Sequence, residues 1–133
     1  MDQITIRIEA EINPTESEQK VREAVENIFG PMNVQIKPLH RGHILQANTS
    51  SQEPLAKFHD VLQREHIRAA ARTVLLSRME KNKISFCLNK QVAHSRHVSF
   101  SQEENESPLG PIRVEILTQN PREIVDYLTY IRR

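Results

Sequence analysis

Aromatic side chains, cysteines and glycines are scarce in this sequence, and each scarcity excludes a class of protein. Tryptophan is absent and aromatic residues make up 5% of the chain, so a broad platform for stacking nucleic-acid bases is not expected. The single cysteine, Cys87, excludes an internal disulfide and is typical of the reducing cytosol. The three glycines do not form a phosphate-binding loop, so we expect neither nucleotide-dependent chemistry nor a cofactor.

The chain also lacks an excess of one charge and any long hydrophobic run. It carries 18 Lys and Arg against 17 Asp and Glu, a net charge of +1, so a nucleic-acid site must come from local clustering of basic residues. No apolar run approaches the roughly 20 residues that span a bilayer, and the N-terminus begins directly with a strand pattern rather than a signal peptide. We therefore expect a cytoplasmic protein that does not enter a membrane, with residues 1–133 forming one domain.

Apolar residues that alternate with polar ones predict the strands. Residues 4–12 alternate strictly, with Arg7 and Glu9 among the outward positions, as in a strand with one buried and one wet face. Shorter alternations predict strands at 34–36, 44–45, 84–88, 98–100 and 112–116. Pro38 limits the first of these to an edge or a bulge.

Apolar residues at helical spacing predict four longer helices and one short turn. The ranges are 15–29, 54–62, 67–81 and 121–131, with a turn at 89–94. Thr15 and Glu18 fit a capping box, and Gly30 followed by Pro31 ends the first helix. Arg78 falls on the apolar stripe of the third helix, which we interpret as a side chain that extends to solvent at the helix end. Polar loops are expected at 48–51 and 102–107, and the element order predicts an α+β fold with a largely antiparallel sheet covered by helices.

Histidine pairs and the lone cysteine are candidates for metal or catalytic chemistry. His94 and His97, or His40 and His43, have a spacing compatible with metal binding, and Cys87 is a candidate third ligand. This spacing is common by chance, and Cys87 has the pattern of a small core or cross-strand residue. The sequence therefore predicts no metal site and no catalytic residue.

Basic residues are the more informative candidates. Two of them lie one helical turn apart, two lead into the first hairpin, and three bracket the fourth strand and the turn beyond it. Each alone is explained as a solvated charge, whereas a groove would form if they converged. They are Arg68 and Arg72, Lys37 and Arg41, and Lys83, Lys90 and Arg96.

The turn after the fourth strand is a candidate anion site. If Asn89 caps a short helix, the amides of Gln91 and Val92 and the ammonium of Lys90 can face one anion. The alternative is that Asn89 only caps the turn and Lys90 is solvated.

Three segments resemble a small archaeal protein family. They are Ile84-x-Phe86-x-Leu88 followed by Asn89-Lys90-Gln91-Val92-Ala93, then Pro108-Leu109-Gly110-Pro111-Ile112 with Val114-Glu115-Ile116, and Ala71-Arg72 with Val74-Leu75-Leu76. The resemblance spans nearly the whole chain. It implies a fold like that of the large-subunit ribosomal protein that binds 5S rRNA, and an RNA-binding role. His94 and His97 depart from this family, in which we expect apolar or basic residues there.

We therefore expect a non-catalytic domain that binds RNA through its phosphate backbone. The alternatives are a protein-interaction module, such as a homodimer formed through a sheet edge, and a small enzyme that uses His94 or Cys87. Basic residues gathered on one face would favour RNA binding. An exposed apolar patch would favour the interaction module. A pocket that joins Cys87 and His94 to a carboxylate would favour the enzyme. The expected RNA contacts are Lys37, Arg41, Arg68, Arg72, Lys83, Asn89, Lys90, Gln91 and Arg96.

Overall fold

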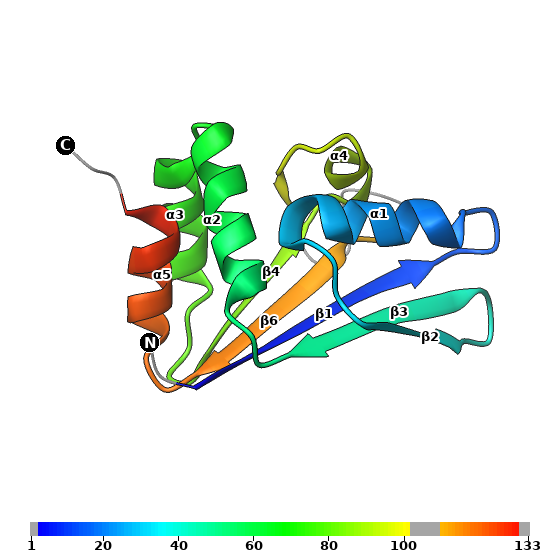
Figure 1. Ribbon diagram of the computed structural model, residues 1–133, viewed down its shortest axis with the longest axis horizontal. Helices are drawn as coiled ribbons and strands as arrows, with labels where there is room; N and C mark the ends of the chain where they lie inside the picture. The colour runs from blue at the N-terminus through cyan, green and yellow to red at the C-terminus, as the bar shows by residue number, and fades with distance from the viewer. Residues whose placement is uncertain (1–2, 102–109, 131–133) are drawn as a thin grey trace.

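A sheet and a layer of helices build the protein. In the computed structural model, which describes residues 3–101 and 110–130, five helices lie on one face of a six-stranded sheet (Figure 1). The other face of the sheet is left without helices. The α+β fold with an antiparallel sheet that the sequence predicts is therefore confirmed.

All neighbouring strands of the sheet run antiparallel, in the order β2-β3-β1-β6-β4-β5. The long strands β1 and β6 lie at the centre, and the short strands β2 and β5 form the two edges. The strand bounds are β1 Ile4–Ile12, β2 Val34–Pro38, β3 His43–Thr49, β4 Lys83–Leu88, β5 Phe100–Ser101 and β6 Ile112–Thr118.

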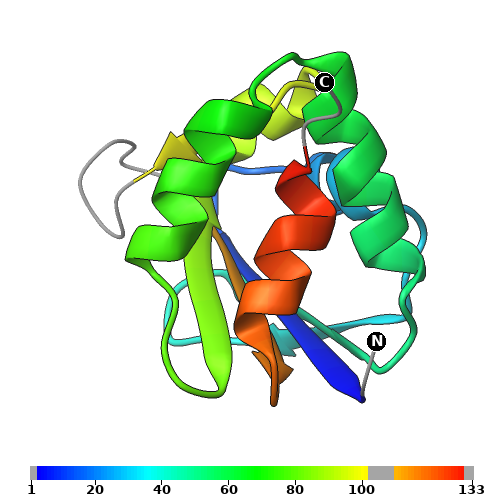
Figure 2. The same cartoon turned by 90° about the vertical axis from the view of Figure 1, so that its left-hand side faces the viewer.

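The helices form two groups over the same face. Helices α1 and α4 pack together over one end of the sheet, and α2, α3 and α5 cover the other. Figure 2 shows α5 between α3 and α2. The helix bounds are α1 Glu18–Phe29, α2 Glu53–Arg64, α3 Arg68–Ser77, α4 Lys90–His94 and α5 Pro121–Thr129.

The core lies between the helices and the sheet. Ile6 and Ile8 of β1 are fully buried there, whereas Arg7 between them is exposed, as the alternation predicts. Phe58 packs against Phe29 and Phe86, with ring centroids 5.2 and 5.6 Å apart. These rings join α2 to α1 and β4.

The first helix begins later than its predicted capping box. Ser17, not Thr15, is the N-cap of α1, and its hydroxyl accepts a 3.3 Å hydrogen bond from the Lys20 amide. Glu16 precedes this cap, and its carboxylate accepts hydrogen bonds from the amide and side chain of Asn13. The predicted end is confirmed: Gly30 has a positive φ of 81° and donates to the Glu26 carbonyl.

Two other predicted boundaries are wrong because strand pairing overrides the local pattern. Helix α3 ends at Ser77, since Met79 forms a bridge to Ile84. Strand β3 continues to Thr49, because Asn48 and Thr49 pair with β1. The predicted last helix is too long, because α5 ends at Thr129 and Tyr130 is its C-cap with extended backbone angles. The predicted loop 102–107 lies outside the described residues.

In the part of the chain that the structure describes, no helix has both the length and the apolar composition needed to cross a bilayer.

Candidate nucleic-acid interface

A shallow cavity of about 710 Å³ occupies the face of the sheet that the helices leave uncovered. Side chains of β1, β3, β4 and β6 line it, together with the end of α3. We call this cavity the open-face basin. Its charged lining residues are Arg7, Glu9, Arg78, Lys83, Arg113 and Glu115.

Strand register assembles the basin in rows across the sheet. Gln46, Glu9, Arg113 and Cys87 form one row on β3, β1, β6 and β4. The next row contains Asn48, Arg7, Glu115 and Ser85. A third contains Thr5, Leu117 and Lys83. Because alternate residues of a strand share one face, the polar positions of four strands meet on one surface.

The carboxylates of the basin neutralise only part of its positive charge. Glu115 lies 3.6 Å from Arg7 and 3.8 Å from Lys83, and Glu9 accepts a 2.7 Å hydrogen bond from Gln46. The side chain of Arg7 is 57% exposed, and such solvated ion pairs contribute little energy. They therefore exchange readily for contacts with an anionic ligand.

Two further arginines complete the basin. Arg78 is exposed at the end of α3, and Arg113 is partly exposed on β6. Within the described residues, neither guanidinium lies within 4.0 Å of a carboxylate. The basin therefore holds four cationic groups against two carboxylates, two of the cations without a carboxylate partner among those residues.

Three of the predicted RNA contacts lie in or near this face. Lys83 lines the basin and also contacts Glu80 at 3.4 Å. Lys37 pairs in register with Ile44 on β3, which places it on the open face near the β2 edge. Arg41 is exposed in the turn between β2 and β3.

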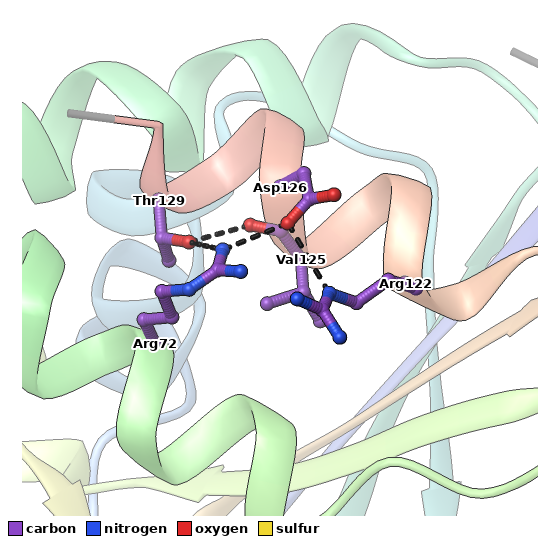
Figure 3. Close-up of polar contacts among 5 residues, drawn as sticks. All are labelled: Arg72, Arg122, Val125, Asp126 and Thr129. Carbon is purple, nitrogen blue, oxygen red and sulfur yellow. Dashed lines mark hydrogen bonds and ion pairs between the residues drawn. The ribbon is translucent and has the colours of Figure 1, made fainter. Parts of the chain in front are cut away.

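Arg68 and Arg72 instead connect α3 to α5 within the helical layer. The guanidinium of Arg68 donates to the Tyr130 carbonyl at 2.8 Å. Arg72 donates to Asp126 at 2.8 Å and to the Thr129 hydroxyl at 3.2 Å (Figure 3). The hydrogen bond from Arg72 lowers the pKa of Asp126, outweighing the opposite effect of burial. These two arginines belong to a helix contact on the other side of the sheet from the basin.

Lys90 does not face solvent, and the predicted anion site at its ammonium group is wrong. The side chain is 3% exposed, and its Nζ donates to the Glu11 carbonyl at 2.7 Å and to Glu16 at 2.8 Å. Burial raises the pKa of Glu16, but the hydrogen bonds from Lys90 and Asn13 outweigh it, so the net pKa is lowered. The charge that was expected to bind phosphate already neutralises a carboxylate.

The predicted cap at Asn89 is confirmed and belongs to the same internal contact. Its side-chain oxygen accepts a 2.9 Å hydrogen bond from the Val92 amide. At the other end of α4, the Asn27 amide group donates to the carbonyls of Ala93 and His94 at 3.0 and 3.1 Å. Helix α4 is therefore held from both ends, and Gln91 is exposed on its outer side.

Arg96 follows α4 in a left-handed conformation, with φ of 69°. Its carbonyl accepts a 2.6 Å hydrogen bond from Arg64 of α2, and its side chain is exposed. The nine predicted contacts therefore lie on separate surfaces, and only Lys37 and Lys83 share the open face.

Of the four histidines that were considered as metal ligands, His94 and His97 each face a carboxylate. His94 lies 3.5 Å from Glu23, and His97 lies 2.8 Å from Glu65. Burial opposes ionisation of Glu65, but hydrogen bonds from His97 and Val98 lower its pKa overall. Across residues 3–101 and 110–130, no three His, Cys, Asp or Glu side chains gather as a metal site. That the protein holds no metal stays a prediction, and elemental analysis of the purified protein would test it.

Sequence reasoning missed Arg7, Arg78 and Arg113 as members of the candidate site. The alternation placed Arg7 on the wet face of its strand, and it does the same for Arg113. It does not show that β1 and β6 are neighbours, with Arg7 opposite Glu115 and Glu9 opposite Arg113. The pairing of β1 with β6 brings together residues more than 100 positions apart. No pattern in the local sequence predicts it.

Comparison with known proteins places the chain in a family. Residues 5–118 match a protein family described as RNA binding. A UPF0201 protein of Sulfurisphaera tokodaii is 41% identical over 124 residues, which cover 93% of this chain and 86% of that protein. A UPF0201 protein of Aeropyrum pernix is 34% identical over 126 residues, covering 94% and 84%. The chain belongs to this family.

Solved structures of the same family have the same fold. The crystal structure of a UPF0201 protein from Methanococcus jannaschii superposes with a TM-score of 0.82 at 29% identity, covering 94% of this chain and 98% of that one. A second UPF0201 crystal structure gives 0.75 at 28% identity, covering 94% and 92%. The resemblance to an archaeal RNA-binding family is confirmed, whereas the likeness to the 5S rRNA-binding ribosomal protein stays a prediction. The family match contains every residue that lines the basin.

Proposed function

We propose that this protein binds RNA through the open-face basin and does not catalyse a reaction on it. One observation carries the proposal. Arg7, Arg78, Lys83 and Arg113 gather in one cavity on the uncovered face of the sheet, in a chain whose family is described as RNA binding.

The chemistry of the basin favours contacts with the RNA backbone. Guanidinium and ammonium groups bind phosphate oxygens by charge-assisted hydrogen bonds. Thr5, Gln46, Asn48 and Ser85 line the same cavity, and such groups form hydrogen bonds with ribose 2′-hydroxyls. Among the described residues of the lining, the one aromatic residue is Phe86, which is 2% exposed, so base stacking on its ring contributes little.

The positions of the reactive side chains support a role without catalysis. Cys87 is buried on the basin side of the sheet, whereas His94 belongs to α4 on the helical side. These two groups lie on opposite sides of the sheet and do not form a nucleophile and base pair.

A single cysteine also suits the reducing cytoplasm, where we place the protein.

A homodimer formed through the edge of β2 is the second candidate. It is favoured by the position of β2, which in the described part of the chain pairs with β3 alone. Lys37 and Pro38 on this short strand disfavour pairing with another strand. Sedimentation across a range of protein concentrations tests this candidate, which requires a mass that rises to that of two chains.

Fluorescence anisotropy with labelled RNA tests the main proposal. Arg113→Ala should weaken binding to unrelated sequences and lower the dependence of log affinity on log salt by about one unit or less, because one phosphate contact is lost. Arg22→Ala is a matched control, since Arg22 is exposed on α1 in the helical layer. The proposal is wrong if the wild-type protein binds no RNA at low salt, or if the two variants bind alike.

A further inference from the structure

A second cavity adjoins the open-face basin where β1 begins and β6 ends. Its volume is about 550 Å³, and this end of the sheet lies beside the N-terminus in Figure 1. We call it the carboxamide pocket. It is lined by Gln3, Thr5, Asn82, Leu117, Thr118 and Gln119.

The pocket and the basin share a boundary. Thr5 lines both cavities, and Leu117 lies between Thr5 and Lys83 in one row of the sheet. Lys83 belongs to the basin. Lys83 and the pocket residues Thr5 and Leu117 therefore lie in the same row across the sheet. When the phosphate of a nucleotide contacts Lys83, the pocket lies next to that nucleotide.

The lining of the pocket differs in chemistry from that of the basin. Gln3, Asn82 and Gln119 are exposed carboxamides, and in the described part of the chain their side chains form no hydrogen bonds with other residues. Each offers an N–H donor beside a carbonyl acceptor. Leu117 adds an apolar surface, and none of the lining side chains that the structure describes is charged. Such a site is suited to a flat, uncharged group with donors and acceptors along its edge.

We propose that the carboxamide pocket binds an unpaired adenine base of the RNA held in the basin. This inference rests on the proposed function. Carboxamides pair with the N6 and N7 atoms of adenine, whereas arginine or lysine suits guanine and aspartate or glutamate suits cytosine. Unpaired bases expose these edges to a protein, and paired bases in an RNA helix do not. The uncharged described lining therefore favours adenine, in a single strand or a bulge, over guanine and cytosine, and the comparison with uracil is left to the binding test below.

Titration of the whole chain with two small probes, followed by NMR, separates the two cavities. Adenosine, which has no phosphate, should shift the side-chain amide signals of Gln3, Asn82 and Gln119. Inorganic phosphate should shift the Nε–H signals of the basin arginines and leave those amides in place. If adenosine moves other residues or none, the pocket assignment is wrong, whatever phosphate does.

Binding to short homopolymeric RNAs tests the same inference with the proposed ligand. The wild-type protein should prefer oligo(A) over oligo(C) and oligo(U) by at least about fivefold, as one bidentate contact provides. Asn82→Ala combined with Gln119→Ala should abolish this preference and retain the salt dependence. Arg113→Ala should do the opposite, weakening all three RNAs while the preference remains.

The outcomes distinguish the two proposals. RNA binding without a preference for oligo(A), or a preference that survives the loss of Asn82 and Gln119 side chains, overturns the adenine pocket alone. A failure to bind any RNA overturns both proposals.

Discussion

The buried Lys90 and the partly buried Glu16 form an ion pair that joins α4 to the turn between β1 and α1. The Nζ–Oε1 distance is 2.8 Å, and the two side chains are 3% and 13% exposed. Glu16 also accepts hydrogen bonds from Asn13, and Lys90 donates to the Glu11 carbonyl. The Asn89-Lys90-Gln91 piece therefore holds two distant parts of the chain together, with Lys90 as its buried contact.

Removing one member of this pair should destabilise the protein strongly. Lys90→Ala should lower the free energy of unfolding by up to about 3–5 kcal/mol, because the partly buried carboxylate of Glu16 loses its charged partner and keeps only the hydrogen bonds from Asn13. Gln91→Ala is the control, since the adjacent side chain is exposed. Urea denaturation measures both, and equal midpoints for the two variants would show that the pair contributes nothing.

The same pair should make stability depend on pH. The folded protein lowers the pKa of Glu16, so the contribution of this group is present above its unfolded value of about 4.3 and is lost as the pH falls through the folded value. Glu16→Gln should therefore be less stable than the wild-type protein at neutral pH, and the difference should shrink below about pH 4.3. Urea unfolding at several pH values measures this difference. A difference that stays constant into acid would contradict the argument.

The contact between α3 and α5 should matter for stability and not for RNA. Arg72→Ala removes the bonds to Asp126 and Thr129 and should cost about 1 kcal/mol, since both charged groups are partly exposed. Arg122→Ala removes a longer, 3.4 Å contact to the same carboxylate and should cost less. Thermal unfolding and RNA titration are the two measurements. If Arg72→Ala lost much of its RNA affinity at unchanged stability, Arg72 would be an RNA contact, and this prediction would be wrong.

The register of β1 is testable with two neighbouring residues. Ile6→Ala should lower the free energy of unfolding by about 2–5 kcal/mol, because Ile6 is fully buried under the helices. Arg7→Ala should cost much less, because that side chain lies on the wet face. Similar denaturation midpoints for the two variants would rule out this register.

Local patterns predicted the elements well where the physical cause is itself local. The strict alternation of residues 4–12 gave β1 with its buried face, and Asn89 and Gly30 were correctly assigned as caps. Ser17, not Thr15, caps α1, and the neighbouring Glu16 is held by Lys90, a residue 74 positions away. Such a contact leaves no trace in the local sequence.

The candidate site was harder to predict, because the location of a charge depends on distant neighbours. Arg68 and Arg72 have the spacing of a basic helix face. Both nevertheless donate hydrogen bonds to α5 or its C-cap, which lie more than 50 residues further along the chain. Arg7 and Arg113 are ordinary outward residues of two strands until β1 and β6 pair. The spacing of residues along the chain shows which of them share one face of a helix or strand. Which other residues lie beside that face depends on the order of the strands and the packing of the helices.

Reversing charge on the two faces of the molecule tests the central claim most directly. Arg7→Glu with Arg113→Glu alters the basin, and Lys20→Glu with Lys57→Glu makes the same change in charge on exposed residues of α1 and α2. We expect the basin variant to lose at least about a hundredfold in RNA affinity at low salt, because like charges brought together cost several kcal/mol, and the helical variant to lose much less. Equal losses in two folded variants, or a greater loss in the helical one, would contradict RNA binding by the open face of the sheet.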